Sequence, residues 1–249
     1  MSDRRQVAVP VADLLHAPDG RRERQVLCGA DVTVLERRDG WANVRTAADG
    51  YGGYLRETDL RASADVTHWV SARATHAYPV ADFKAQELLG LSLGSRVRVI
   101  AEGRMFFETD QGFIPRVHLR ALTELERDPV SVAERFLRTP YLWGGNSAFG
   151  IDCSGLVQAG CRACGIACPG DSGVQAAELG VCLGDEALLR GDLLFWKGHV
   201  AWVVDEAVLL HANVHHMAVA YEALDAAVER IGRQGDGPVT ARKRLEISR

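Results

Sequence analysis

The 249-residue sequence predicts an α+β protein, with two small β-rich barrels followed by a larger domain of helices packed on an antiparallel sheet. Two observations predict the barrels: short β-forming runs are separated by glycine turns, and the same series of runs occurs twice. The larger domain is predicted by a change of pattern near residue 128, from strands and turns to helices and then strands. The expected domains are residues 1–62, 63–123 and 124–249.

Residues 26–60 are expected to be entirely β-structure. A β-rich run covers residues 32–35, Asp39-Gly40 forms a turn, and the strand restarts at residues 41–44. A second turn, at Asp49-Gly50, leads into the next strand. Short strands joined by such turns are typical of a small barrel.

The same arrangement recurs about 60 residues later. Residues 93–99 (LGSRVRV) resemble residues 28–34 (CGADVTV), and Gly112–Ile114 resembles Gly53–Leu55. Two copies of a small barrel therefore fit the pattern best. A single larger β-sandwich remains the alternative, because the repeat is degenerate.

The third domain is expected to contain two helices. Asp128-Pro129 begins a helix over residues 130–138, which Thr139-Pro140 ends. A second helix is expected from residue 152 or 153 to about residue 164, with Gly165 following it in the position that favours glycine. A helix that starts directly after a loop presents free backbone N–H groups at its first turn.

Three buried strands are expected after the helices, over residues 192–196, 199–204 and 208–212. Short turns separate them, so they should pair as an antiparallel sheet. A glycine-rich loop at residues 143–146 (WGGN) lies upstream of the second helix. A helix crossing such a sheet gives the predicted α+β arrangement.

Composition excludes several classes of function. Charged residues make up 25% of the chain, the net charge is −4, and no basic stripe favours a nucleic-acid or membrane partner. No long apolar stretch follows Arg4 and Arg5, so we expect a cytoplasmic protein, and a monomer by default. The six cysteines should then be reduced, and therefore buried, metal-bound or catalytic.

Cys153 lies where a loop becomes a helix. The partial positive charge of a helix N-terminus favours a thiolate over a thiol, especially beside a cation. The free N–H groups of that turn can also bind the oxyanion of a tetrahedral intermediate. The cation would be an imidazolium on His199, at the start of an apolar strand. His211 lies in the next strand, where it could bond one ring nitrogen of His199 and hold the other toward Cys153.

Other readings of these residue types are less favourable. A lone buried cysteine is usually a small hydrophobe, but here it occurs together with a glycine-rich loop and two strand histidines. Ser154 lacks the glycine pattern of a serine nucleophile. Neither the cysteine cluster nor the histidine cluster has the spacing of a common metal site, so packing is favoured over metal binding. The two clusters are Cys161, Cys164 and Cys168, and His211, His215 and His216.

Five sequence blocks together resemble the NlpC/P60 family of papain-like cysteine peptidases. They occur in the family's order over residues 128–249, and the two upstream repeats resemble bacterial SH3-like domains. The resemblance implies a papain-like catalytic domain behind two SH3-like barrels, with no metal or organic cofactor. The blocks are residues 140–145, 152–157, 191–196, 198–200 and 210–212.

The resemblance also implies a reaction and a set of roles. The arrangement is similar to that of endopeptidases that hydrolyse the γ-D-glutamyl–L-diamino acid bond of small murein peptides. Cys153 would be the nucleophile, His199 the base and His211 the orienting residue. Tyr141 would assist the oxyanion site, and Asp152 would bind the free amine of an N-terminal L-Ala.

Further positions are carried over by the same resemblance. Ser154 and Ser172 match positions that line the substrate groove, while Tyr51 and Glu23 match residues that the first barrel sends toward the site. Trp202 departs from the family pattern, and either enters the core or narrows the groove. The alternatives are an N-acetylmuramoyl-L-alanine amidase or acyltransferase with the same dyad, and a non-catalytic wall-binding protein.

Overall fold

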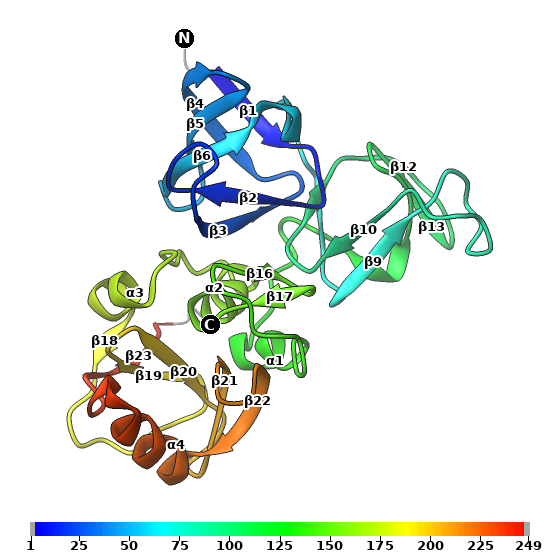
Figure 1. The fold of residues 1–249 in the computed structure, drawn as a ribbon. Coiled ribbons are helices and arrows are strands. Elements are labelled where there is room, and N and C mark those ends of the chain that lie inside the picture. Colours follow the sequence, from blue (N-terminus) through cyan, green and yellow to red (C-terminus); the bar gives the residue numbers. More distant parts are fainter. Residues whose placement is uncertain (1–2, 247–249) are drawn as a thin grey trace. The chain divides into compact units, whose positions relative to one another are not determined.

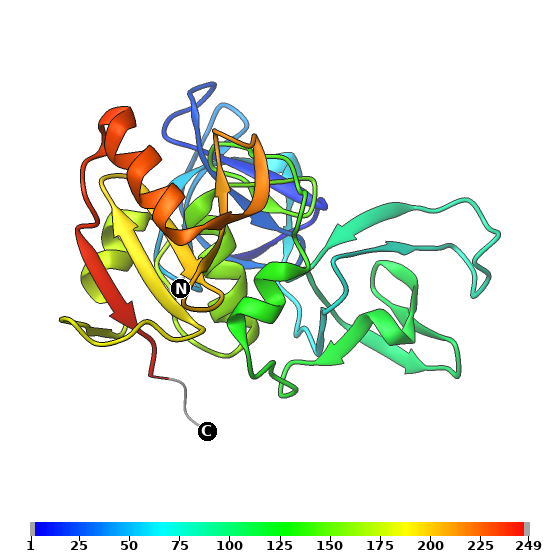
Figure 2. The ribbon, with the colours of Figure 1, turned by 90° about the horizontal axis from the view of Figure 1, so that it is seen from below.

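The structure is a computed structural model that describes residues 3–246. The chain divides into two compact units (Figures 1 and 2). The first unit contains residues 1–125 and the short segment 146–149, and the second contains residues 126–145 and 150–249. The predicted boundary at residue 62 falls within the first unit and stays a prediction.

The N-terminal part of the first unit is a seven-stranded sheet with neighbours in the order β3-β2-β6-β5-β4-β1-β7. Its core is aliphatic and includes Leu14, Val32 and Val44. Asp39 and Gly40 both have positive φ in the turn between β4 and β5, which confirms the predicted hairpin. The elements are β1 (Asp3–Val7), β2 (Val11–Leu15), β3 (Arg22–Leu27), β4 (Asp31–Arg38), β5 (Trp41–Thr46), β6 (Gly52–Arg56), the 3-10 helix η1 (Glu57–Asp59) and β7 (Leu60–Ala62).

The following part of this unit differs from the predicted second barrel. Its strands fall into three small sheets, with orders β10-β9, β11-β8-β15 and β12-β13-β14, so a closed barrel is not seen. The elements are β8 (His68–Val70), β9 (Ala74–Ala77), β10 (Leu89–Ser92), β11 (Arg96–Val97), β12 (Val99–Glu102), β13 (Phe106–Thr109), β14 (Gly112–Pro115), the 3-10 helix η2 (Arg116–His118) and β15 (Leu119–Ala121).

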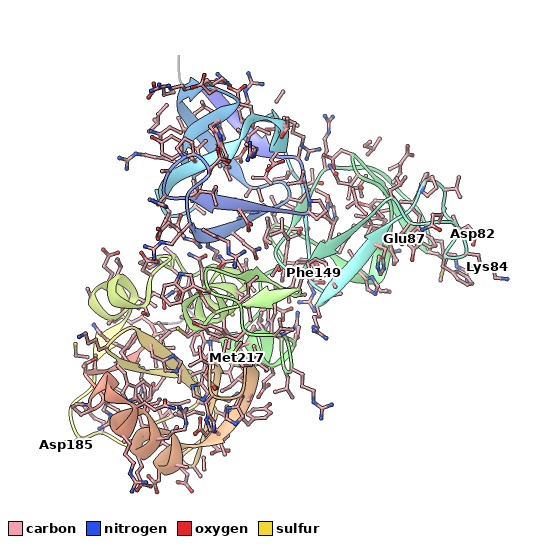
Figure 3. The ribbon with its side chains drawn as sticks, in the orientation of Figure 1. Asp82, Lys84, Glu87, Phe149, Asp185 and Met217 are labelled. Atoms are coloured by element: carbon pink, nitrogen blue, oxygen red, sulfur yellow. The ribbon has the colours of Figure 1, made fainter. Side chains whose placement is uncertain are left out.

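Two features interrupt the hydrogen-bond ladder in this region. Strand β11 has only two residues, and the pairing of β12 with β13 shifts register between Val99 and Ala101. The connection between β9 and β10 carries the exposed charged side chains of Asp82, Lys84 and Glu87 (Figure 3). The three sheets nevertheless share one apolar core.

The sequence repeat has a structural counterpart at its glycines. Gly29 and Gly94, which the repeat aligns, have φ of 75° and 89°, a conformation that side chains with a Cβ rarely adopt. Gly29 lies just before β4, and Gly94 lies just before β11. The repeat therefore reflects backbone turns as well as apolar spacing.

The second unit contains a six-stranded sheet with neighbours in the order β18-β23-β19-β20-β21-β22, all antiparallel. The three predicted strands correspond to β19, β20 and β21 and are confirmed. The elements after residue 125 are α1 (Pro129–Glu134), β16 (Asn146–Ser147, in the first unit), β17 (Gly150–Ile151), α2 (Cys153–Ala163), α3 (Ser172–Glu178), β18 (Val181–Cys182), β19 (Asp192–Trp196), β20 (His199–Val203), β21 (Val208–Asn213), β22 (Ala218–Ala223), α4 (Leu224–Ile231), the π-helical turn η3 (Gly232–Asp236) and β23 (Ala241–Arg244).

Helix α1 is shorter than predicted, whereas α2 agrees with the prediction. The backbone leaves α1 after Glu134, and Arg138 has a φ of 68° with its N–H donating to the carbonyl of Val219. The predicted helix to residue 138 is therefore wrong at its C-terminal end. In α2 the cap falls at Cys164, and Gly165 follows with a φ of 75°, as expected for a glycine after a helix.

Helix α2 packs closely on β20, and glycine permits the approach. A Cβ on Gly160 would lie 3.2 Å from Cζ2 of Trp202 and 2.6 Å from the carbonyl oxygen of Pro129. Trp202 is fully buried, so its indole fills the core beneath α2 and does not line a groove. This close packing fixes the first residue of α2 relative to the start of β20.

Candidate active site

Cys153 is the first residue of α2, as predicted. Asp152 is the N-cap, and its Oδ1 accepts hydrogen bonds from the N–H of Gly155 (2.7 Å) and the hydroxyl of Ser154 (3.1 Å). The other carboxylate oxygen, Oδ2, accepts from the N–H of Gly144 at 2.8 Å. One carboxylate thus holds both the glycine-rich loop and the helix start around the sulfur.

Tyr141 reaches the site from the segment before that loop. Its backbone forms a parallel bridge with Ile151, and its N–H donates to the carbonyl of Met217 at 2.9 Å. Burial, and then the nearby Cys153 and Asp152, raise the pKa of the Tyr141 hydroxyl. The Tyr141 hydroxyl therefore stays a neutral O–H donor, as its expected role at an oxyanion requires.

The two strand histidines meet as predicted. Nε2 of His199 lies 2.8 Å from Nδ1 of His211. The antiparallel register between β20 and β21 pairs Trp202 with Leu210, which places the two imidazoles diagonally on one face of the sheet. Nδ1 of His199 has no hydrogen-bond partner among residues 3–246. It is the nitrogen left to receive a proton.

The chain of contacts continues to two residues that sequence reasoning missed. Nε2 of His211 lies 3.0 Å from Oε2 of Glu222 on β22. Arg230 of α4 then donates twice to that carboxylate, from Nε to Oε1 (2.8 Å) and from Nη2 to Oε2 (2.7 Å). The only sequence signal was Glu222, a charged residue within the otherwise weakly polar strand β22. Its alignment with His211 depends on a register that the sequence does not reveal.

Burial keeps the Cys153 thiol and the His199 imidazole neutral at rest. Burial, and then the Asp152 carboxylate, raise the pKa of the Cys153 thiol, against hydrogen bonds from the backbone N–H groups of Val200, Ser154 and Cys153 itself, which lower it. Burial also lowers the pKa of His199 to about 3 and that of His211 to about 4. The site therefore rests as a thiol and neutral imidazoles.

Within residues 3–246, no direct hydrogen bond joins the Cys153 sulfur to the imidazole of His199, whose Nε2 contacts His211. The link between the two residues is the backbone N–H of Val200, the residue after His199, which lowers the pKa of the Cys153 thiol. A neutral thiol is a weak hydrogen-bond donor, so a direct bond from it to an imidazole is weak at rest. Catalytic hydrogen bonds are often long without substrate and tighten when it binds.

Ser154 and Ser172 lie on adjacent helices. Ser172 is the first residue of α3 and is half-buried, while Ser154 lies in the first turn of α2. Gln175, also missed from the sequence, links the helices: its Nε2 donates to the carbonyls of Ser154 (3.0 Å) and Pro169 (2.9 Å). This buried amide fixes α3 against the helix start that carries Cys153.

Tyr51 and Glu23 belong to the first unit. Tyr51 lies just before β6 and packs against the barrel core, with the guanidinium of Arg24 4.9 Å from its ring centre. Glu23 is half-buried on β3. Their predicted approach to the catalytic residues stays a prediction, because it concerns a different unit from the one that holds Cys153.

The remaining cysteines are free thiols in different environments. Cys161 is fully buried, and a hydrogen bond with Cys168, followed by burial, raises its pKa well above the usual range. Cys182 is exposed, which departs from the expectation that each cysteine is buried, metal-bound or catalytic. Within residues 3–246, no three His, Cys, Asp or Glu side chains gather as metal ligands. No helix of that range has the length and apolarity to cross a bilayer.

Comparison with known proteins follows the same division of the chain. Residues 138–229 match the NlpC/P60 family, and residues 14–60 match the bacterial dipeptidyl-peptidase SH3 domain. A Bacillus subtilis protein named gamma-D-glutamyl-L-lysine dipeptidyl-peptidase is 31% identical over 217 residues, which cover 76% of this chain and 72% of that protein. A Bacillus cereus protein of the same name is 27% identical over 223 residues, covering 76% of this chain and 67% of its own length.

The fold is shared with a solved structure. A crystal structure of an NlpC/P60 family protein from Bacillus cereus has a TM-score of 0.81 and 21% identity, and the match covers 97% of this chain and 99% of that chain. A thiol at a capped helix start and a hydrogen-bonded histidine pair on an antiparallel sheet are groups that a cysteine peptidase uses, and the matches identify the chain as a cysteine peptidase. The chain belongs to the NlpC/P60 family and carries an N-terminal bacterial SH3 domain.

Proposed function

We propose that this peptidase hydrolyses the γ-D-glutamyl–L-diamino acid bond of small murein peptides whose N-terminal L-Ala has a free amine. The observation that carries the proposal is the Asp152 carboxylate, fixed one residue before the nucleophile. In the substrate, the ammonium group of L-Ala is separated from the bond to be cut by only the L-Ala and D-Glu residues. The names of the two Bacillus relatives support the same bond.

The reaction would proceed through a thioester. The thiol of Cys153 transfers its proton to Nδ1 of His199, and the sulfur attacks the γ-carbonyl of D-Glu. Backbone N–H groups of the first turn of α2 and the hydroxyl of Tyr141 stabilise the oxyanion. His199 then returns the proton to the leaving amine of the diamino acid. In the second half, His199 takes a proton from water, which attacks the thioester and releases the dipeptide and the thiol.

The Asp152 carboxylate and the ammonium group of the substrate have opposite effects on the pKa of the Cys153 thiol. The Asp152 carboxylate raises the pKa of the Cys153 thiol, which disfavours the thiolate in the empty site. An ammonium group paired with Asp152 would neutralise that effect. A substrate with a free amine would therefore promote formation of the Cys153 thiolate that attacks it, whereas a peptide with an acetylated N-terminus would not.

Tripeptide hydrolysis with mass-spectrometric readout tests the proposal. L-Ala-γ-D-Glu-L-Lys and its meso-diaminopimelate counterpart should give L-Ala-D-Glu and the free diamino acid. Cys153→Ala should abolish turnover and retain substrate binding. Release of L-Ala in place of L-Ala-D-Glu, or turnover by Cys153→Ala near that of the parent enzyme, would refute it. Cytoplasmic location and a monomeric state stay predictions.

A further inference from the structure

We propose that Glu222, held by Arg230, is a positioning residue that sets the tautomers of both active-site imidazoles, so that Nδ1 of His199 is left unprotonated and able to take the proton of the thiol. This inference rests on the proposed function for its kinetic test only. The contact chain itself runs from His199 through His211 and Glu222 to Arg230.

The direction of the chain follows from what its last member can accept. Arg230 donates to both oxygens of Glu222, and its bonds to that carboxylate are the main cause that lowers the pKa of Glu222 to about 2. An ionised carboxylate has no proton to donate. Glu222 is therefore an acceptor only, at any pH at which the enzyme works.

Each neutral imidazole then has only one permitted tautomer. Since Glu222 only accepts, Nε2 of His211 must carry the proton in their 3.0 Å contact. A neutral imidazole with a proton on Nε2 has a bare Nδ1, so Nδ1 of His211 accepts from Nε2–H of His199 across 2.8 Å. His199 in turn is left with a bare Nδ1. The reversed chain would leave His199 with a proton on Nδ1, unable to act as a base.

The charge of Glu222 also acts during the reaction. When Nδ1 of His199 takes the thiol proton, His199 becomes an imidazolium that donates to His211 through Nε2. The Glu222 carboxylate raises the pKa of both histidines, and Arg230 lowers them. The other group that acts on the pair is His216, which lowers the pKa of His211. Removing Glu222 therefore leaves the His199 imidazolium and the Arg230 guanidinium without the carboxylate that balances their charge.

The chain offers a matched control pair in the same sheet. Arg244 of β23 donates to Asp192 of β19 with the same two-bond geometry, from Nε to Oδ1 (2.8 Å) and from Nη2 to Oδ2 (2.7 Å). Asp192 is as deeply buried as His211, and its carboxylate accepts hydrogen bonds from Arg244 and the N–H of Leu189, not from either histidine. Asp192→Asn thus breaks an equivalent ion pair and tests for loss of function through instability alone.

Kinetics of the full-length enzyme form the first test. Glu222→Gln and Glu222→Ala should each lower kcat for the tripeptide about 10- to 100-fold with KM little changed, as removal of an orienting partner typically does. Both should also slow alkylation of Cys153 by iodoacetamide at neutral pH, read by peptide mass spectrometry, and move the acid limb of the kcat/KM profile to lower pH. Asp192→Asn should leave that limb and the alkylation rate unchanged.

Nitrogen-15 NMR of histidine-labelled enzyme forms the second test and needs no substrate. In the parent enzyme, His199 and His211 should both be neutral with the proton on Nε2. Glu222→Ala should show a mixture of arrangements, which would support the proposal even if the tripeptide proved to be the wrong substrate. A proton on Nδ1 of His199 in the parent enzyme, or equal losses in Glu222→Gln and Asp192→Asn, would overturn it.

Discussion

Asp152→Asn separates the two tasks of the N-cap carboxylate. Asparagine is as good an N-cap as aspartate, and its Oδ1 can keep the bonds from Gly155 and Ser154. Its amide group would face the N–H of Gly144, donor against donor, and lose that bond. The expected cost is about 1 kcal/mol of unfolding free energy, against about 3 kcal/mol for Asp152→Ala, which loses all three bonds.

The charge has a larger effect on the substrate than on the fold. A hydrogen bond between two charged groups is stronger than one with a neutral partner by about 1–2 kcal/mol, so kcat/KM for a free-amine tripeptide should fall about 5- to 30-fold in Asp152→Asn. The N-acetylated tripeptide lacks the cation, so the parent enzyme should cut it slowly and Asp152→Asn should cut it no more slowly. The charge of Asp152 is thus measured as the change in the ratio of the two rates.

Thiol reactivity should change in the opposite direction. Because Asp152 raises the pKa of Cys153, the Asn variant should have more thiolate at neutral pH and be alkylated faster. The assay is iodoacetamide labelling followed by peptide mapping, since the exposed Cys182 also reacts. An unchanged ratio of free to acetylated rates, or slower labelling of Cys153, would refute the electrostatic reasoning.

Three further predictions follow from the same unit. Gly160→Ala should lower the unfolding free energy, measured with urea, by about 1–3 kcal/mol, because the added Cβ meets the ring of Trp202; an unchanged value would contradict the packing described. Tyr141→Phe should lower kcat about 100-fold with KM little changed, and a change in KM alone would argue against an oxyanion role. Burial lowers the pKa of His199 to about 3 and that of His211 to about 4, so between these values and the unfolded pKa of about 6.5 the unfolded chain binds more protons than the folded one. The free energy of unfolding should therefore be highest above pH about 6.5 and fall as the pH is lowered below that value. A free energy of unfolding that rises on acidification would contradict the burial of the two neutral imidazoles.

Sequence patterns predicted the parts of the fold that local chemistry decides. Asp128 and Asp152 both cap helices, and Gly165 follows α2 with positive φ, as their residue types indicate. The C-terminal end of α1 was not predictable, because the N–H of Arg138 bonds to Val219, which is distant in the chain. The open second barrel depends likewise on a register shift between strands.

In the site, too, contacts between strands adjacent in the sequence could be predicted, whereas contacts that depend on distant elements could not. The contact of His199 with His211 followed from two adjacent strands of known polarity and a short connection. Glu222 and Arg230 were missed, since their alignment with His211 needs the register of a third strand and the direction of α4. The roles of Tyr51 and Glu23 depend on another unit of the chain.

Acid-quenched mass spectrometry of the enzyme during turnover tests the central chemical claim most directly. With L-Ala-γ-D-Glu-L-Lys present, the peptide that contains Cys153 should gain the mass of an L-Ala-γ-D-Glu acyl group, and hydroxylamine should remove it. Hydrolysis without acylation of that peptide, or an acyl group on another residue, would contradict a Cys153 thioester.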